Sequence, residues 1–248
     1  MFCIDDSQIH ILGIHITFYA VLPVLGIVLS MAAAAMLCKR LGWQVRASVY
    51  AAALVFSAMT VLRLYQDDLP PVVLPFMIPL GQLGIMAAAY IAGRRLGQPG
   101  LHVPFTFTIP LYLGVSKLGC FLSGCCYGRP YGGVLSVTYG SETLCRVRNV
   151  PLFPAQLVTA LLLFAVAAAA YVLVSRRRDN DMLLALCGLT PLVYYGAVGL
   201  CDPATGNIVL SYIMAAVSLA WTLFWLLKAF DIYAIFSEKI RKIKGEYK

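Results

Sequence analysis

Residues 152–174 read LFPAQLVTALLLFAVAAAAYVLV, an apolar run without a charged residue that is followed by Arg176, Arg177 and Arg178. A helix needs about 20 mostly apolar residues to cross the hydrocarbon core of a bilayer, so this run is long enough to span it. The run lacks the period-two alternation of a barrel strand. A helix also satisfies its own backbone hydrogen bonds in lipid, whereas an open sheet edge does not. The stretch therefore predicts a transmembrane helix.

Runs of the same kind recur along the chain. The predicted spans are residues 12–37, 49–65, 72–92, 104–124, 152–174, 182–201 and 207–228. Of the 248 residues, 61% are hydrophobic and 12% are charged, and the mean hydropathy is +0.83, whereas a soluble domain carries about 25% charged residues. We therefore predict an all-α, polytopic integral membrane protein with about seven transmembrane helices in one domain over residues 1–248.

Most of the 19 Lys and Arg residues lie in alternate connections and in the C-terminal tail, while the other connections are mainly acidic. Basic residues are retained on the cytoplasmic side of a membrane, so the N-terminus is predicted outside and the C-terminus in the cytoplasm. This places an outer loop at about residues 128–150 and a cytoplasmic tail at about residues 229–248. Because the topology accounts for the net charge of +8, no nucleic-acid partner is expected.

The connection after the fourth predicted span holds the most unusual sequence. Residues 117–130 read KLGCFLSGCCYGRP. Glycine allows close backbone approach, and Gly128-Arg129-Pro130 turns the chain out of the helix while leaving a guanidinium near the interface. Lys117 lies near or just inside the membrane boundary, where an unpaired ammonium is costly. Either this ammonium extends to the interface, or Lys117 and Arg129 together bind a lipid phosphate.

This stretch resembles the signature of bacterial prolipoprotein diacylglyceryl transferases, whose core reads Arg-x-Gly-Asn-Phe-x-Asn-Gly-Glu-x-x-Gly-Arg. The matching positions are Gly119, Phe121, Gly124, Gly128 and Arg129. Two further stretches are similar to family motifs: ITFYA at residues 16–20 in the first span, and PAQL at residues 154–157 at the start of the fifth. The resemblance covers most of the chain.

The resemblance implies an enzyme that moves a diacylglyceryl group from phosphatidylglycerol to the lipobox cysteine thiol of a preprolipoprotein, releasing glycerol phosphate. It implies a multi-pass protein of the bacterial cytoplasmic membrane, and we expect no cofactor. Lys117 and Tyr19 are the expected catalytic residues, and Lys117, Gly119, Gly128, Arg129 and Gln156 the expected substrate-binding residues.

His15 and Tyr19 are four residues apart, and therefore on one face of the predicted first helix. There His15 is a candidate base or phosphate donor, and hence a third catalytic residue. The alternative is that both residues anchor the helix at the interface.

The chain departs from the family at several polar positions. The arginine of the signature is Lys117 here, and its asparagine and glutamate fall at Cys120 and Cys125. The His-Gly-Gly motif of the third span corresponds to PLGQLG at residues 79–84, and the Arg-Phe-x-x-Glu pattern of the sixth span to VYYGA at residues 193–197. These replacements keep an alternative open: a non-catalytic or redox-active lipid-binding relative.

The eight cysteines are at positions 3, 38, 120, 125, 126, 145, 187 and 201. Cys38 and Cys187 are predicted to be small packing residues, and the others lie at or near the predicted outer face, which can be oxidising. Cys145 is a candidate disulfide partner of Cys125 or Cys126. Redox chemistry and a metal held by the sulfurs of residues 120, 125, 126 and 145 are the alternatives. The spacing does not match the usual zinc pairs, so we expect a disulfide here, or between residues 3 and 201, and no metal.

Overall fold

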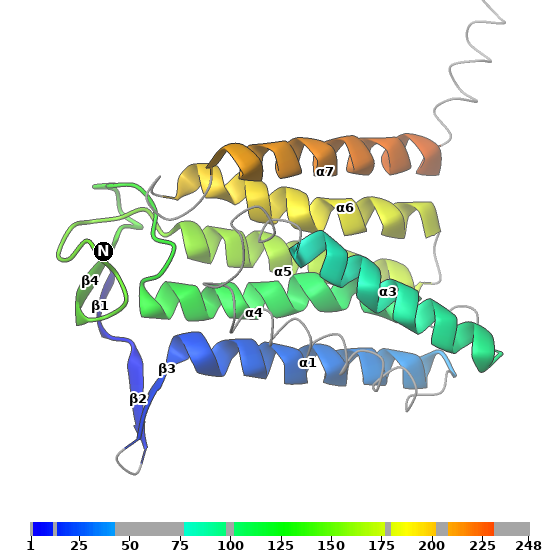
Figure 1. The fold of residues 1–248 in the computed structure, drawn as a ribbon, viewed down its shortest axis with the longest axis horizontal. Helices are drawn as coiled ribbons and strands as arrows, with labels where there is room; N and C mark the ends of the chain where they lie inside the picture. The colour runs from blue at the N-terminus through cyan, green and yellow to red at the C-terminus, as the bar shows by residue number, and fades with distance from the viewer. Residues whose placement is uncertain are drawn as a thin grey trace, which may run out of the picture.

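The computed structural model describes residues 2–11, 14–42, 77–97, 102–176, 180–201 and 208–230. Its long helices form a bundle (Figure 1): α1 (Phe18–Arg40), α3 (Met77–Arg95), α4 (Thr108–Ser123), α5 (Ala155–Ser175), α6 (Asn180–Gly196) and α7 (Ile208–Ala229). Two short 3₁₀ helices accompany them. Helix η2 (Val103–Phe107) leads into α4, and η3 (Ala197–Leu200) follows α6.

Five helical segments of the described chain are long and apolar enough to cross a membrane: Phe18–Arg40, Val103–Ser123, Ala155–Ser175, Met182–Leu200 and Ile208–Ala229. A mainly helical membrane protein is therefore confirmed. The five segments overlap the predicted spans 12–37, 104–124, 152–174, 182–201 and 207–228. Helix α3 overlaps the predicted span 72–92 but is not among the five. The predicted span 49–65 and residues 231–248 of the predicted tail lie outside the described residues.

The bundle packs in the order α1, α4, α5, α6, α7, with α3 against η2 and α6. Small residues bring α1 and α4 together. A side chain at Gly26 would lie 3.2 Å from the Tyr112 carbonyl oxygen of α4, and the Ser30 hydroxyl donates to the Thr108 carbonyl at 3.1 Å. Because lipid gives little hydrophobic driving force between helices, close packing and interhelical hydrogen bonds of this kind hold membrane bundles together.

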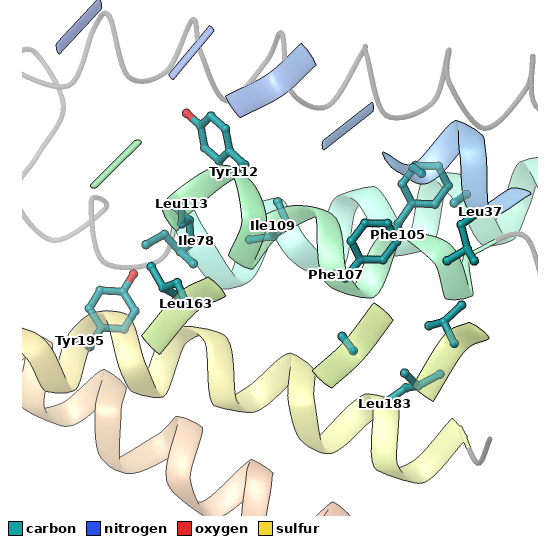
Figure 2. Close-up of a cluster of buried hydrophobic side chains, with 14 of the residues drawn as sticks. Leu37, Ile78, Phe105, Phe107, Ile109, Tyr112, Leu113, Leu163, Leu183 and Tyr195 are labelled. Atoms are coloured by element: carbon teal, nitrogen blue, oxygen red, sulfur yellow. The ribbon is translucent and has the colours of Figure 1, made fainter. Parts of the chain in front are cut away.

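The main apolar core lies between α1, α4, α5 and α6, where η2 inserts its aromatic side chains. Phe105 and Phe107 are 1% and 2% exposed, and Ile109 and Leu163 are fully buried. Figure 2 shows these side chains with Leu37 of α1 and with Leu183 and Tyr195 of α6. Packing in this core therefore sets the position of α4 relative to the neighbouring helices.

Two small two-stranded sheets accompany the helices, and the mostly helical structure stays compatible with the all-α prediction. Strand β1 (Phe2–Asp6) pairs in parallel with β4 (Val137–Glu142), and β2 (Gln8–Ile11) pairs antiparallel with β3 (Ile14–Thr17). The predicted start of the first span at residue 12 is wrong, because α1 begins at Phe18. Hydropathy alone does not separate a helix from a strand. The isoleucines at positions 9, 11, 14 and 16 are β-branched and favour extended backbone.

This correction affects one predicted site residue directly. His15 lies in β3, where it pairs with His10 of β2, whereas Tyr19 lies in the first turn of α1. The prediction that the two residues share a helix face is therefore wrong.

The two ends of the bundle differ. One end, which we name the loop end, carries the sheets and residues 124–154 between α4 and α5 (Figure 1). At the opposite end, α1, α3 and α7 finish with basic residues in their last turns: Lys39, Arg40, Arg94, Arg95 and Lys228.

Candidate functional site

The last turn of α4 and the loop after it form a compact structure at the loop end. Helix α4 ends at Gly124, whose φ of +74° is left-handed. Tyr127, Val137, Tyr139, Cys145 and Leu152 then form a small buried core. The Tyr139 hydroxyl donates to the Phe121 carbonyl of α4 at 2.9 Å. Main-chain bonds between Val137 and Leu152 close the loop. The small core and these hydrogen bonds therefore hold the loop after α4 against the last turn of the helix.

Lys117 is half-buried on α4. Its ammonium nitrogen lies 4.3 Å from the centroid of the Tyr194 ring of α6. A cation over an aromatic face is stabilised by the ring quadrupole, and more strongly where water is excluded. This pairing could not be predicted from the sequence, because Tyr194 is distant in the chain and belongs to a different helix.

Gly119 marks the crossing of α4 with the start of α1. A side chain at Gly119 would lie 3.0 Å from the Phe18 carbonyl oxygen and 3.1 Å from Leu22 Cβ. The glycine therefore lets the two backbones meet beside Tyr19, which is half-buried. The two stretches that carry the family resemblance in α1 and α4 are in direct contact.

Gly128 and Arg129 lie where the loop runs past the ends of α5 and α6. Gly128 forms an antiparallel bridge with Cys201, and a side chain at Gly128 would overlap the backbone of Phe153. The Arg129 amide donates to the Leu200 carbonyl at 3.4 Å, and the Phe153 amide donates to the Arg129 carbonyl at 2.9 Å. The Arg129 residue itself is exposed.

Gln156, in the first turn of α5, is 1% exposed. Its side-chain nitrogen donates to the Cys125 carbonyl at 2.7 Å. Its side-chain oxygen is buried without a hydrogen-bond partner in the described structure, as is the Ser123 hydroxyl. A buried polar atom without a partner costs free energy, and in native proteins calls for an explanation such as a bound molecule or water. Residues 154–157, the third stretch that resembles a family motif, therefore contact the same loop through Gln156.

Cys120, Cys125 and Cys126 form what we name the three-thiol cluster. Their sulfur atoms all lie within 4.8 Å of one another. Cys145 packs against Gly124, and its thiol donates to the Val147 carbonyl at 3.1 Å. Among the described residues, none of the eight cysteines is joined to another by a disulfide bond. The structure therefore brings together three of the four sulfurs singled out from the sequence, and the predicted disulfides stay predictions. Cys38 and Cys187 are buried packing residues, as predicted.

The loop environment favours neutral side chains. Hydrogen bonding with the Cys120 thiol, together with that from Cys126 and burial, raises the pKa of the Cys125 thiol. Burial raises the pKa of the Cys145 thiol and of the Tyr139 hydroxyl. These thiols therefore hold their protons near neutral pH unless another charge stabilises the thiolate.

Comparison of the chain with protein-family models and with curated proteins found no match. The likeness to diacylglyceryl transferases thus rests on the residues quoted above. The structure places Lys117, Tyr19, Gly119, Gly128, Arg129 and Gln156 at the loop end or in the helix turns next to it. Tyr139 and Tyr194 are additional residues that the sequence analysis did not select as site residues, although Tyr194 lies in the stretch aligned with the family pattern of the sixth span.

Proposed function

We propose that this protein is a membrane enzyme resembling the diacylglyceryl transferases, which moves diacylglycerol from phosphatidylglycerol to a lipobox cysteine thiol. One observation carries the proposal. Three stretches that resemble family motifs, far apart in the sequence, meet at the loop end: Gly119 packs on Phe18 of α1, within the stretch of residues 16–20, and Gln156 hydrogen-bonds the loop after α4. If the likeness of the three stretches to family motifs were a coincidence, there would be no reason for the three stretches to lie together in the fold.

The proposed topology has the loop end outside the bacterial cytoplasmic membrane and the C-terminus inside. It is supported by the basic last turns of α1, α3 and α7, which gather at the opposite end of the bundle. Basic residues concentrate on the cytoplasmic side. Phosphatidylglycerol of the outer leaflet and a preprolipoprotein lipobox segment would then approach the loop end.

The proposed chemistry needs a cation next to the leaving group. The acceptor thiol loses its proton to solvent, and its sulfur bonds to the glyceryl carbon. The bond from that carbon to the phosphate oxygen breaks, and the oxygen leaves with the electron pair as glycerol phosphate. Negative charge develops on the phosphate, and a preorganised cation stabilises it best where water is excluded. Lys117 supplies an ammonium with three hydrogen-bond donors, and the Tyr194 ring orients it. Arg129 is exposed in the loop as a second, forked donor.

The test is transfer by purified protein supplied with labelled phosphatidylglycerol and a lipobox peptide. We expect thioether-linked diacylglycerol on the peptide, with a rate that falls about 100-fold or more in Lys117→Met, as when one transition-state donor is removed. Lys228→Met is a matched control, because Lys228 also lies over an aromatic ring, that of Trp225 at 4.5 Å, but at the opposite end of the bundle. Transfer that is equal in both variants would remove Lys117 from the mechanism.

A second candidate is a non-catalytic or redox-active lipid-binding relative. It is favoured by the three-thiol cluster, since Cys120 and Cys125 stand where the family signature has asparagine and glutamate. In the same assay this candidate binds labelled phosphatidylglycerol but forms no thioether product. That result would contradict the transferase proposal while keeping a lipid site.

A further inference from the structure

The three-thiol cluster depends on an unusual backbone turn. Gly124 ends α4 with φ +74°, and Cys126 follows with φ 51°. Two left-handed residues in close succession fold the chain back, so that the sulfurs of Cys125 and Cys126 return to that of Cys120 in the last helical turn. A non-glycine residue at positive φ costs about 1 kcal/mol and persists only where its surroundings hold it. The turn therefore brings three sulfurs together at an energetic cost.

The chemistry of this group selects a soft cation. Within the described residues the group contains only cysteines, and no carboxylate or imidazole joins it. Thiolates favour Zn²⁺ and Cu⁺ over hard cations such as Mg²⁺ or Ca²⁺. Zn–S bonds of about 2.3 Å at tetrahedral angles place the sulfurs about 3.8 Å apart. Sulfurs already within 4.8 Å of one another reach that geometry by small side-chain movements.

The surroundings suit such a centre in two further ways. Three thiolates around Zn²⁺ carry a net negative charge, and the Lys117 ammonium lies within electrostatic reach of Cys120 and Cys126. A buried charge is tolerated when an opposite charge compensates it. In addition, Gln156 is anchored to the Cys125 carbonyl and keeps a buried side-chain oxygen without a partner. Polar groups of this kind support the ligands of metal centres.

We infer that Cys120, Cys125 and Cys126 bind one soft d¹⁰ cation, Zn²⁺ or Cu⁺, through three thiolates, leaving a further coordination position open. Each thiol releases its proton to solvent as its sulfur binds the cation. The inference departs from the disulfide expected from the sequence, and it holds whether or not the protein transfers diacylglycerol. Spacing alone missed the site, because the pattern of four residues between the first two cysteines and none between the next two becomes a metal-binding pattern only through the turn at Gly124 and Cys126.

The test uses the full chain in detergent, reduced and freed of metal, with Zn²⁺ alone and Cu⁺ alone titrated against chromophoric chelators. We expect one cation per chain in at least one titration, and the tighter of the two identifies the metal. Cys125→Ser should weaken binding by more than about 100-fold, which exceeds the effect of losing a group that only hydrogen-bonds a metal ligand. Cys145→Ser is the matched control, because Cys145 is also buried in this loop but its thiol bonds to Val147, and it should bind as the wild type does.

A second measurement covers the case in which a variant does not fold. In the wild-type protein, bound metal should protect Cys120, Cys125 and Cys126 from alkylation, mapped by peptide mass spectrometry, while exposed Cys3 reacts equally with and without metal. The inference is overturned if neither cation binds the reduced protein at one per chain, or if Cys145→Ser weakens binding as much as Cys125→Ser. It is also overturned if the cluster purifies as a disulfide and its reduced form binds no metal.

Discussion

Tyr139 ties the loop to the last turn of α4 by a single side chain. It is fully buried, and its hydroxyl donates to the Phe121 carbonyl at 2.9 Å. We predict that Tyr139→Phe lowers the free energy of unfolding by about 1 kcal/mol, the usual net value of such a hydrogen bond. Thermal unfolding in detergent, followed by circular dichroism, measures the change.

The same residue predicts a pH dependence. Burial raises the pKa of Tyr139 above its ordinary value of 10.0, so the folded protein binds the phenolic proton more tightly than the unfolded chain. The contribution of Tyr139 to stability is complete below about pH 10 and is lost as the pH rises through the higher folded-state value. Wild-type stability should therefore fall more steeply above pH 10 than that of Tyr139→Phe. Parallel curves for the two proteins would contradict this assignment.

Gly124 predicts a steric effect that can be separated from backbone strain. A side chain there would lie 2.9 Å from Cys145 Cβ and 3.0 Å from Tyr139 Cδ1, whereas at Gly97, with a similar φ of +68°, it would meet nothing within 4 Å. Alanine at either position incurs about 1 kcal/mol of left-handed strain. Gly124→Ala should cost a further 1–3 kcal/mol or so from overpacking. Equal unfolding temperatures for the two variants would exclude the close packing at Gly124.

At the scale of the elements, α6 and α7 make a close helix pair. A side chain at Gly188 of α6 would overlap the Trp221 ring and the Thr222 hydroxyl of α7, and the Trp221 indole donates to the Leu184 carbonyl at 3.0 Å. Small residues at such crossings allow backbones to approach in membranes. The pair should therefore be sensitive to a single added methyl group.

We predict that Gly188→Ala lowers stability by about 1–3 kcal/mol, measured by thermal unfolding in detergent. Gly84→Ala in α3 is the control, because a side chain there meets nothing within 4 Å. Its expected effect is neutral or stabilising, since alanine is the better helix former. A neutral Gly188→Ala would mean that α7 does not pack on α6 at this point.

The elements differ in how well the sequence predicts them. Helices α4 to α7 follow from long apolar runs, because a spanning helix needs little besides length and hydropathy. Strand β1 does not, since it forms only when the chain end meets β4, with Phe2 opposite Val137. Tertiary pairing of this kind leaves little local signal.

The candidate site shows the same limit. Lys117, Gly119 and Gln156 stand out by residue type and motif, whereas the Lys117–Tyr194 contact and the return of Cys126 to Cys120 depend on the folded backbone. Spacing therefore identifies which residues carry the chemistry, while the fold decides which of them act together.

Over the whole molecule, charge and cysteine exposure give a test of orientation. Cys3 is exposed in β1 at the loop end, whereas Cys38 and Cys187 are buried inside the bundle. If the basic end is cytoplasmic, as the retention of Lys and Arg requires, Cys3 faces the outside. A membrane-impermeant maleimide added to intact cells should then label the wild type, and Cys3→Ser should remove most of that labelling.

Two controls make the outcome unambiguous. A tag fused after Lys248 should stay protected from protease in the same cells, because the odd number of crossings predicted from the sequence places the N- and C-terminal parts of the chain on opposite sides. Cys38 and Cys187 should react only after denaturation, which reports that the bundle stayed folded during labelling. Labelling of Cys3 only after the cells are opened would reverse the orientation and place the three-thiol cluster and Lys117 at the cytoplasmic face. In that case phosphatidylglycerol of the outer leaflet would be excluded as the lipid donor.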